Sequence, residues 1–207
     1  MSGHLTRAAA VLLALAVAGC AEQDVSAPSH PNLIIVRDFG ASPGVMTLDR
    51  SFGFSLDRGA PGVSAGQRAA SLGRAAAFTL ADTLVEQLRA FGYDAVHSND
   101  GGPEPGGRAL VVTGAFRNID EGSRRSVRAE GSTVGADIEV DYLTQATPPQ
   151  RLMTFQLDSR QVARERIVSA AVGRGESVNA AAARMGAALA RTVAELARRN
   201  SWPGAPR

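Results

Sequence analysis

The stretch Leu110-Val111-Val112-Thr113-Gly114-Ala115-Phe116 decides the fold, because it is apolar enough for a central strand of a sheet. Asp120-Glu121-Gly122-Ser123 follows with the residues of a turn, which predicts a hairpin. Beyond it, Ala136-Asp137-Ile138-Glu139-Val140-Asp141-Tyr142 alternates apolar residues with acids, as a strand does with one face on the core and one in water. Residues 153–157 alternate again, so we expect the next antiparallel strand of a meander.

The first half of the chain predicts a βαβ unit. Leu33-Ile34-Ile35-Val36 is typical of a buried strand, a leucine stripe predicts a helix from about Gln67 to Phe91, and Tyr93 to His97 predicts the following strand. Apolar residues at spacings of three and four predict a last helix from about Ser177 to Asn200. The expected fold class is therefore α+β or α/β, with a βαβ start, an antiparallel meander and helices packed on a single mixed sheet of about five strands.

Composition favours one domain. The chain has 207 residues, 44% of them hydrophobic, and a net charge of +2. Every basic residue is arginine, and removing a leader that contains Arg7 leaves a charge of +1, so no long-range field selects nucleic acid as a partner.

The first twenty residues have the layout of a bacterial signal peptide. Residues 1–7 carry one positive charge, Ala8 to Ala18 form an apolar run, and Val17-Ala18-Gly19-Cys20 closes the segment. Spanning a bilayer takes about 20 apolar residues, so this run is too short to remain as a membrane anchor.

Val17-Ala18-Gly19-Cys20 resembles the lipobox that the bacterial lipoprotein signal peptidase recognises. The resemblance implies cleavage between Gly19 and Cys20, diacylglycerol on the Cys20 sulfur and usually a third acyl chain on its new amino group. Two or more acyl chains hold a protein stably on a membrane. The alternative is an ordinary secreted protein with a stray cysteine, but Cys20 is the only cysteine and lies where the motif requires it.

The lipobox sets the expected domain limits. We expect a signal peptide over 1–19, the lipidated cysteine and a flexible tether over 20–32, a single periplasmic domain over 33–200 and a C-terminal tail over 201–207. By resemblance to lipoproteins of Gram-negative bacteria, Ala21 in place of aspartate after the cysteine implies sorting to the outer membrane, with the domain facing the periplasm.

Two Gly-x-Ser-x-Gly matches are candidate serine nucleophiles. Around Ser42, Pro43 lacks the N–H that an oxyanion hole needs. Around Ser64, a proline interrupts the strand that should lead into the elbow, and only His97 lies downstream to serve as a base. Ser64 and Gln67 also have the spacing of a helix capping box, which is the favoured interpretation.

Metal and cofactor sites have no support in the sequence. The chain beyond residue 20 keeps two histidines and no free cysteine, and no acidic residues have ligand spacing. Gly173-Arg174-Gly175 lacks the pattern of a phosphate-binding loop, so we interpret it as a helix entry turn. We therefore expect no cofactor and no metal.

The segment 114–123, with Arg125 to Gly135 and the alternating strand after it, resembles the uncharacterised bacterial lipoprotein family known as domain of unknown function 4410. The leading strand and the long helix ending in Phe91-Gly92-Tyr93 fit the same family. Gly131-Ser132-Thr133-Val134-Gly135 departs from its glycine-rich run at the middle glycine. The resemblance implies a periplasmic α/β domain with no established activity.

The sequence favours a lipid-tethered, non-enzymatic binding or accessory module that touches an unidentified envelope protein. The alternatives are a serine hydrolase using Ser64 and a component that self-assembles through a free sheet edge. The expected binding surface combines the Gly40 to Gly66 loop and the Asn99 to Gly107 loop, which trail two predicted parallel strands, with Phe52 and Phe54 as its aromatic anchors. The alternative is that both loops are disordered spacers, because Gly, Pro and Ser dominate them. The oligomeric state stays open.

Overall fold

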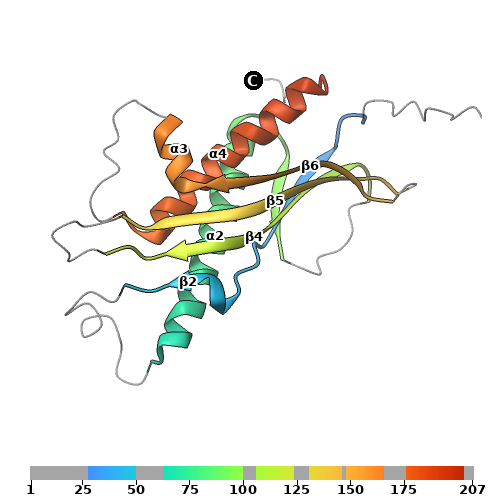
Figure 1. The fold of residues 1–207 in the computed structure, drawn as a ribbon. Helices are drawn as coiled ribbons and strands as arrows, with labels where there is room; N and C mark the ends of the chain where they lie inside the picture. Colours follow the sequence, from blue (N-terminus) through green and yellow to red (C-terminus); the bar gives the residue numbers. More distant parts are fainter. Residues whose placement is uncertain are drawn as a thin grey trace, which may run out of the picture.

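The computed structural model describes residues 28–49, 63–99, 106–123, 131–145, 148–165 and 176–202, which form one mixed sheet with helices on one face (Figure 1). The strands are β1 (Leu33–Arg37), β2 (Met46–Thr47), β3 (Ala95–Ser98), β4 (Ala109–Asp120), β5 (Thr133–Leu143) and β6 (Gln150–Asp158). The helices are α2 (Ala65–Ala90), α3 (Ser159–Glu165), α4 (Val178–Arg199) and the 3-10 turn η1 (Pro43–Val45).

The sheet confirms the predicted α+β class. Its order is β3-β1-β4-β5-β6, with β1 parallel to both β3 and β4, and with β4, β5 and β6 forming the antiparallel meander. The predicted hairpin is present, because Ile119 lies opposite Val134 across the turn. Long β4 is the middle strand of this order, as the apolar run at its start predicts.

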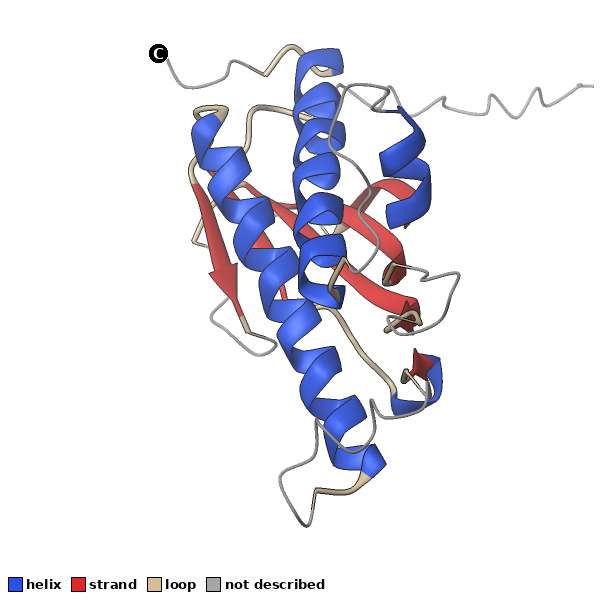
Figure 2. Cartoon of the chain, turned by 90° about the vertical axis from the view of Figure 1, so that its left-hand side faces the viewer, coloured by secondary structure: helices blue, strands red, loops and turns tan. Residues whose placement is uncertain are grey.

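The core lies between the sheet and its two long helices. Ala136, Ile138, Val140 and Tyr142 of β5 are buried against the helices, while the acids between them stay partly exposed, so the predicted alternation is confirmed. Figure 2 shows α2 and α4 side by side on one face of the sheet. They pack so closely that a Cβ at Gly186 would lie 2.6 Å from the Leu80 carbonyl oxygen.

The long helices end in the same local motif. After α2, the amide of Gly92 donates to Arg89 O at 2.9 Å and the amide of Tyr93 donates to Leu88 O at 3.0 Å, which is a Schellman cap with its glycine at φ 89°. The sequence predicted this stop at Gly92. After α4 the left-handed position belongs to Ser201, at φ 56°.

The structure differs from the sequence prediction at the start of the Gly40 to Gly66 segment, which was expected to be loop. Gly40 accepts from Phe116 N at 2.8 Å, and Met46 and Thr47 pair in parallel with Ile119 and Asp120. The second half of β4 therefore has partners on both sides, because this segment satisfies backbone groups that β1 is too short to reach.

Both ends of the described chain pack together beyond the predicted limits of the domain. Trp202 is 5% exposed, its ring centroid lies 6.2 Å from that of Tyr142, and its indole N–H donates to Pro28 O at 2.6 Å. Ser29 Oγ and the Tyr142 hydroxyl share a hydrogen bond of 3.0 Å. The packed region thus reaches from Pro28 to Trp202.

Candidate functional site

Ser64 caps α2. Its Oγ accepts from Gln67 N at 3.2 Å, and the Gln67 side chain accepts from Ser64 N at 2.9 Å, so both halves of the predicted capping box are present. The hydroxyl oxygen thereby satisfies an amide at the start of the helix that has no partner within it.

His97 lies far from this serine. It stands on β3, where its Nε2 is 2.6 Å from Asp38 Oδ1 and its ring is 5.6 Å from that of Phe78 on α2. Phe78 follows Ser64 by 14 residues, which at 1.5 Å per helical residue is about 20 Å along the axis. Ser64 and His97 therefore do not form the nucleophile and base pair that a hydrolase would need.

The predicted loop site lies largely outside the described residues. Its two aromatic anchors, Phe52 and Phe54, lie outside them. The predicted cleavage and lipidation residues, Gly19 and Cys20, also lie outside the described residues. The structure does place the ends of β1 and β3 together, as the parallel arrangement requires, because Arg37 Nη1 donates to Asn99 O at 3.2 Å.

Two general features of the described residues bear on function. They hold no group of three or more His, Cys, Asp or Glu side chains placed to bind a metal ion. Within the same residues, no helix is long and apolar enough to cross a membrane.

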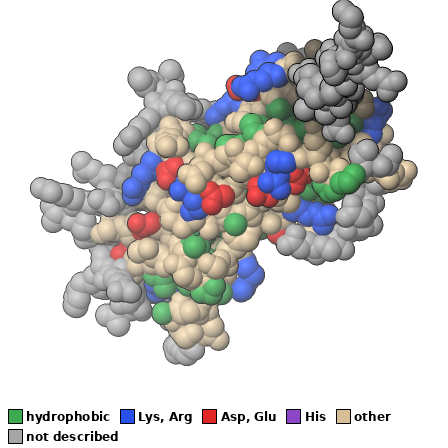
Figure 3. Space-filling view, turned by 45° about the vertical axis from the view of Figure 1, so that its right-hand side comes forward, with side chains coloured by type: hydrophobic (Ala, Val, Ile, Leu, Met, Phe, Trp, Pro, Cys, Tyr) green, Lys and Arg blue, Asp and Glu red, His purple; other side chains and the backbone are tan. Residues whose placement is uncertain are grey.

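The helix-free face of the sheet is lined by ion pairs. Arg151 on β6 contacts Glu139 at 2.9 Å and also Asp141, and Arg117 lies 3.2 Å from Asp137. The hydrogen bond to Asp141 raises the pKa of the Arg151 guanidinium. Figure 3 shows arginines and acids interspersed on one side of the molecule. Partly exposed pairs of this kind contribute little to stability. The same face also carries a small buried apolar cluster of Ile35, Ala109 and Val111, so only its charged part is chiefly solvated.

A buried carboxylate ties three segments together at the far end of β4. Glu121 Oε2 accepts from Asp49 N at 3.0 Å, and the Glu121 carbonyl accepts from Ser132 Oγ at 2.8 Å. Arg68 of α2 lies 3.8 Å from the same carboxylate. We interpret the cluster as structural, because these contacts join the β4–β5 turn to the segment after β2 and to α2.

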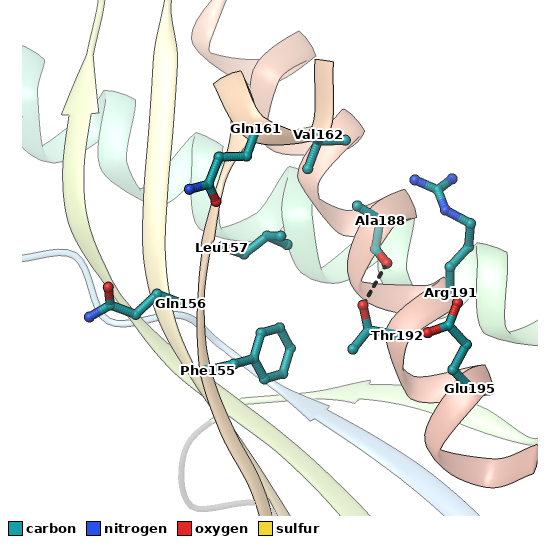
Figure 4. A pocket seen from close by; sticks show the side chains of 9 residues that line it. All are labelled: Phe155, Gln156, Leu157, Gln161, Val162, Ala188, Arg191, Thr192 and Glu195. Atoms are coloured by element: carbon teal, nitrogen blue, oxygen red, sulfur yellow. Dashed lines mark hydrogen bonds between the residues drawn. The ribbon is translucent and has the colours of Figure 1, made fainter. Parts of the chain in front are cut away.

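A pocket of about 340 Å³ opens beside the last strand of the sheet, between β6, α3 and α4 (Figure 4). Phe155 and Leu157 of β6 point toward α4 and form an apolar wall, and Val162 and Ala188 extend it. The Thr192 hydroxyl donates to the Ala188 carbonyl at 3.3 Å. The polar part of the lining consists of Gln156, Gln161, Arg191, Thr192 and Glu195.

The outer edge of β6 borders this pocket. β6 ends the strand order, so among the described residues its backbone pairs only with β5. The first part of the strand is protected from further pairing by Pro148 and Pro149, by Arg151 and by a bulge at Leu152. The uncharged run Met153–Leu157 has no such protection. We call the outer edge of Met153–Leu157, with the pocket beside it, the β6 edge site.

Sequence reasoning found only part of the β6 edge site. The alternation over 153–157 predicted the strand, but α3 was not predicted and the pocket needs all three elements. The signal that was present is the contrast between the proline and arginine at the start of the strand and the uncharged residues after them.

Comparisons with known proteins show only distant similarity. No family model matches the chain, and no curated protein matches it. A neuraminyllactose-binding hemagglutinin homolog from Helicobacter pylori is 11% identical over 85% of this chain and 91% of its own, with a TM-score of 0.40. A hypothetical protein from Chlamydia trachomatis is 9% identical over 83% of this chain and 97% of its own, with a TM-score of 0.32.

Proposed function

We propose that this protein is a lipid-anchored, non-enzymatic binding or accessory module of the bacterial cell envelope. Acyl chains on Cys20 hold it at the outer membrane, and the domain faces the periplasm. In this proposal the chain is a member of the lipoprotein family that its sequence resembles, domain of unknown function 4410.

The β6 edge site is the observation that carries the binding function. An edge strand offers backbone N–H and C=O groups to an added strand, and alternate side chains of that strand need pockets. The β6 edge site combines both features, because the half-buried side chains of Phe155 and Leu157 line the pocket beside a backbone that pairs only with β5 in the described part of the chain.

The attachment of the N-terminal segment suits an anchored domain. The chain is fixed at Pro28 by the hydrogen bond from Trp202. Cys20 precedes Pro28 by eight residues, and eight extended residues span at most about 30 Å. In the proposal, the end of the domain that carries Trp202 therefore stays close to the membrane.

Capping by Ser64 favours a binding module over a serine hydrolase. Ser64 Oγ already accepts a hydrogen bond from the Gln67 amide. His97, the base that the sequence offers, is hydrogen-bonded to Asp38 and lies against Phe78, about 20 Å along α2 from Ser64.

Site-specific photocrosslinking in the native envelope tests the proposal. A benzophenone amino acid replaces Gln156, which is exposed at the β6 edge site, in the full chain, and the matched control carries it at Ser71, exposed on α2. We expect discrete protein crosslinks from position 156 that are absent at position 71. Equal crosslinking at the two positions, or none at position 156, would contradict the proposed binding surface.

A further inference from the structure

The two long helices finish at the end of the domain where the described chain begins. Pro28 O accepts there from the indole N–H of Trp202, which comes just after α4. Burial raises the pKa of Tyr93, which follows α2, and the charge of Arg198 on α4 partly opposes the rise, so the two helix ends are close together. β3 and β4 also start beside the start of β1. We call the exposed surface of this end the Trp202 end; its residues are Arg89, Phe91, Arg108, Arg198 and Arg199.

Exposed arginines gather on the Trp202 end. Arg89, Arg198 and Arg199 lie in the last turns of α2 and α4, and Arg108 directly precedes β4. The acids nearby are Asp94 after α2 and, further back on the two helices, Glu86 and Glu195. Four arginines against three acids give the Trp202 end a net positive charge.

Two of these arginines are available to bind an anion. In the described part of the chain, no hydrogen bond or ion pair involves the Arg199 side chain. The Arg198 side chain is 73% exposed and lies 3.8 Å from that of Glu195 on the same helix, and an exposed pair of this kind is weak. The guanidinium group presents a planar fork of donors that matches the oxygens of a phosphate group.

Phe91 places an exposed ring on the same surface. It is 41% exposed, and Val63 and Phe78 are the other large hydrophobic side chains exposed in the described part of the chain. Phe78 lies 13 residues earlier, about 20 Å away along α2, and Val63 precedes that helix. Phenylalanine enters the boundary between lipid headgroups and acyl chains, beside the phosphates that arginine binds. An exposed ring next to exposed arginines therefore suits a surface that lies on a lipid bilayer.

The tether limits which end of the domain can face the membrane. α2 has 26 residues, so it is about 39 Å long. Figure 1 shows its start at the end of the domain opposite to the end of α4. The residues from Cys20 to Pro28 span at most about 30 Å. With the acyl chains of Cys20 in the membrane, the tether is too short for the domain to stand on the start of α2, so the Trp202 end is the end that reaches lipid.

We propose that the Trp202 end is a membrane-contacting surface, on which Arg198 and Arg199 bind the phosphate groups of anionic phospholipids and Phe91 enters the headgroup region. The inference rests on the proposed function, since the anchor on Cys20 is what brings this end to the bilayer. Each arginine near an anionic surface adds an attraction that salt screens. The contact holds the domain in one orientation, with the start of α2 directed away from the membrane.

Photocrosslinking to lipid in the native envelope tests the contact. A benzophenone amino acid replaces Phe91 in the full chain, in cells whose phospholipids carry radioactive phosphate. The matched control carries it at Ser71, which is exposed in the first half of α2. Diacylglycerol on Cys20 contains no phosphate, so radioactivity that irradiation adds to the denatured chain reports a crosslinked phospholipid. We expect radioactivity with the probe at position 91 and none with the probe at position 71.

Removal of the two arginine charges gives a second readout. The purified, lipidated chain with the probe at position 91 is reconstituted into vesicles of phosphatidylcholine with or without phosphatidylglycerol. We expect Arg198→Gln with Arg199→Gln to lower lipid crosslinking about fivefold or more in the anionic vesicles and to change it little in the neutral ones. The control, Arg74→Gln with Arg160→Gln, removes two exposed arginines away from the Trp202 end and should crosslink as the parent does.

The outcomes separate this inference from the proposed function. Equal radioactivity at the two positions, none at position 91, or crosslinking in anionic vesicles that does not depend on Arg198 and Arg199 overturns the membrane contact. If the same chain still incorporates labelled palmitate, the anchor stands without that contact. A chain that takes no palmitate contradicts the anchor, and this inference with it.

Discussion

Single residues show where local chemistry alone fixes the structure. Ser64 and Gln67 satisfy each other within one turn, and Gly92 supplies the left-handed residue that ends α2. Both features depend on neighbours in the sequence, so the sequence predicts them. Ser201 has the same left-handed conformation without being glycine, and no sequence pattern indicated it.

Ser64→Ala should lower the free energy of unfolding by about 1 kcal/mol, because the substitution removes the side-chain cap of α2. Chemical denaturation of the wild-type and variant proteins measures the loss, and Ser64→Asp, which retains a capping oxygen, should recover most of it. Labelling of wild-type protein by a serine-reactive probe that is abolished in Ser64→Ala would instead support the hydrolase alternative.

Tyr93 should make the fold sensitive to alkaline pH. Burial raises the pKa of its hydroxyl above the ordinary value of 10.0, and Arg198 partly opposes the rise. The folded state therefore holds the proton more tightly than the unfolded state, so this contribution to stability is complete below pH 10 and is lost as the pH rises through the folded pKa. The chain has no lysine, which leaves few other groups titrating there.

The measurement is the free energy of unfolding as a function of pH for the wild-type and Tyr93→Phe proteins. Above about pH 10 the wild-type protein should lose stability more steeply than the variant. Parallel curves for the two proteins would show that the Tyr93 hydroxyl does not titrate differently in the folded state.

At the scale of elements, predictability follows the sequence range of the contacts. The helix expected from Gln67 to Phe91 is observed as Ala65–Ala90, because its stripe and caps are local. In contrast, β2 exists only because Met46 and Thr47 pair with the end of distant β4. The pocket likewise needs β6, α3 and α4 together, so no single segment of sequence indicates it.

Trp202 tests whether the two ends of the domain support each other. Trp202→Ala removes a buried ring, its stacking on Tyr142 and its hydrogen bond to Pro28, and should destabilise the fold by about 3–5 kcal/mol. Trp202→Phe should lose less, because it keeps most of the buried area. A thermal melt of Trp202→Ala that matches that of the wild-type protein would show that residues beyond 200 are a tail.

At the scale of the whole molecule, the proposed function depends on two features: the lipid anchor on Cys20, which the sequence predicts, and the β6 edge site, which the structure shows. The segment that holds Cys20 lies outside the described residues, and the lipobox resemblance is what predicts its chemistry. Cys20→Ser should remove the site of lipid attachment and leave the precursor unprocessed, because the thiol is the only group there that can take diacylglycerol.

Incorporation of labelled palmitate into the full chain tests this anchor most directly, with wild-type and Cys20→Ser proteins expressed side by side in Gram-negative cells. The account predicts a labelled wild-type protein in the outer-membrane fraction and an unlabelled, longer Cys20→Ser chain. Equal labelling of the two proteins, or a wild-type protein that carries no label and leaves the membrane without detergent, would contradict it.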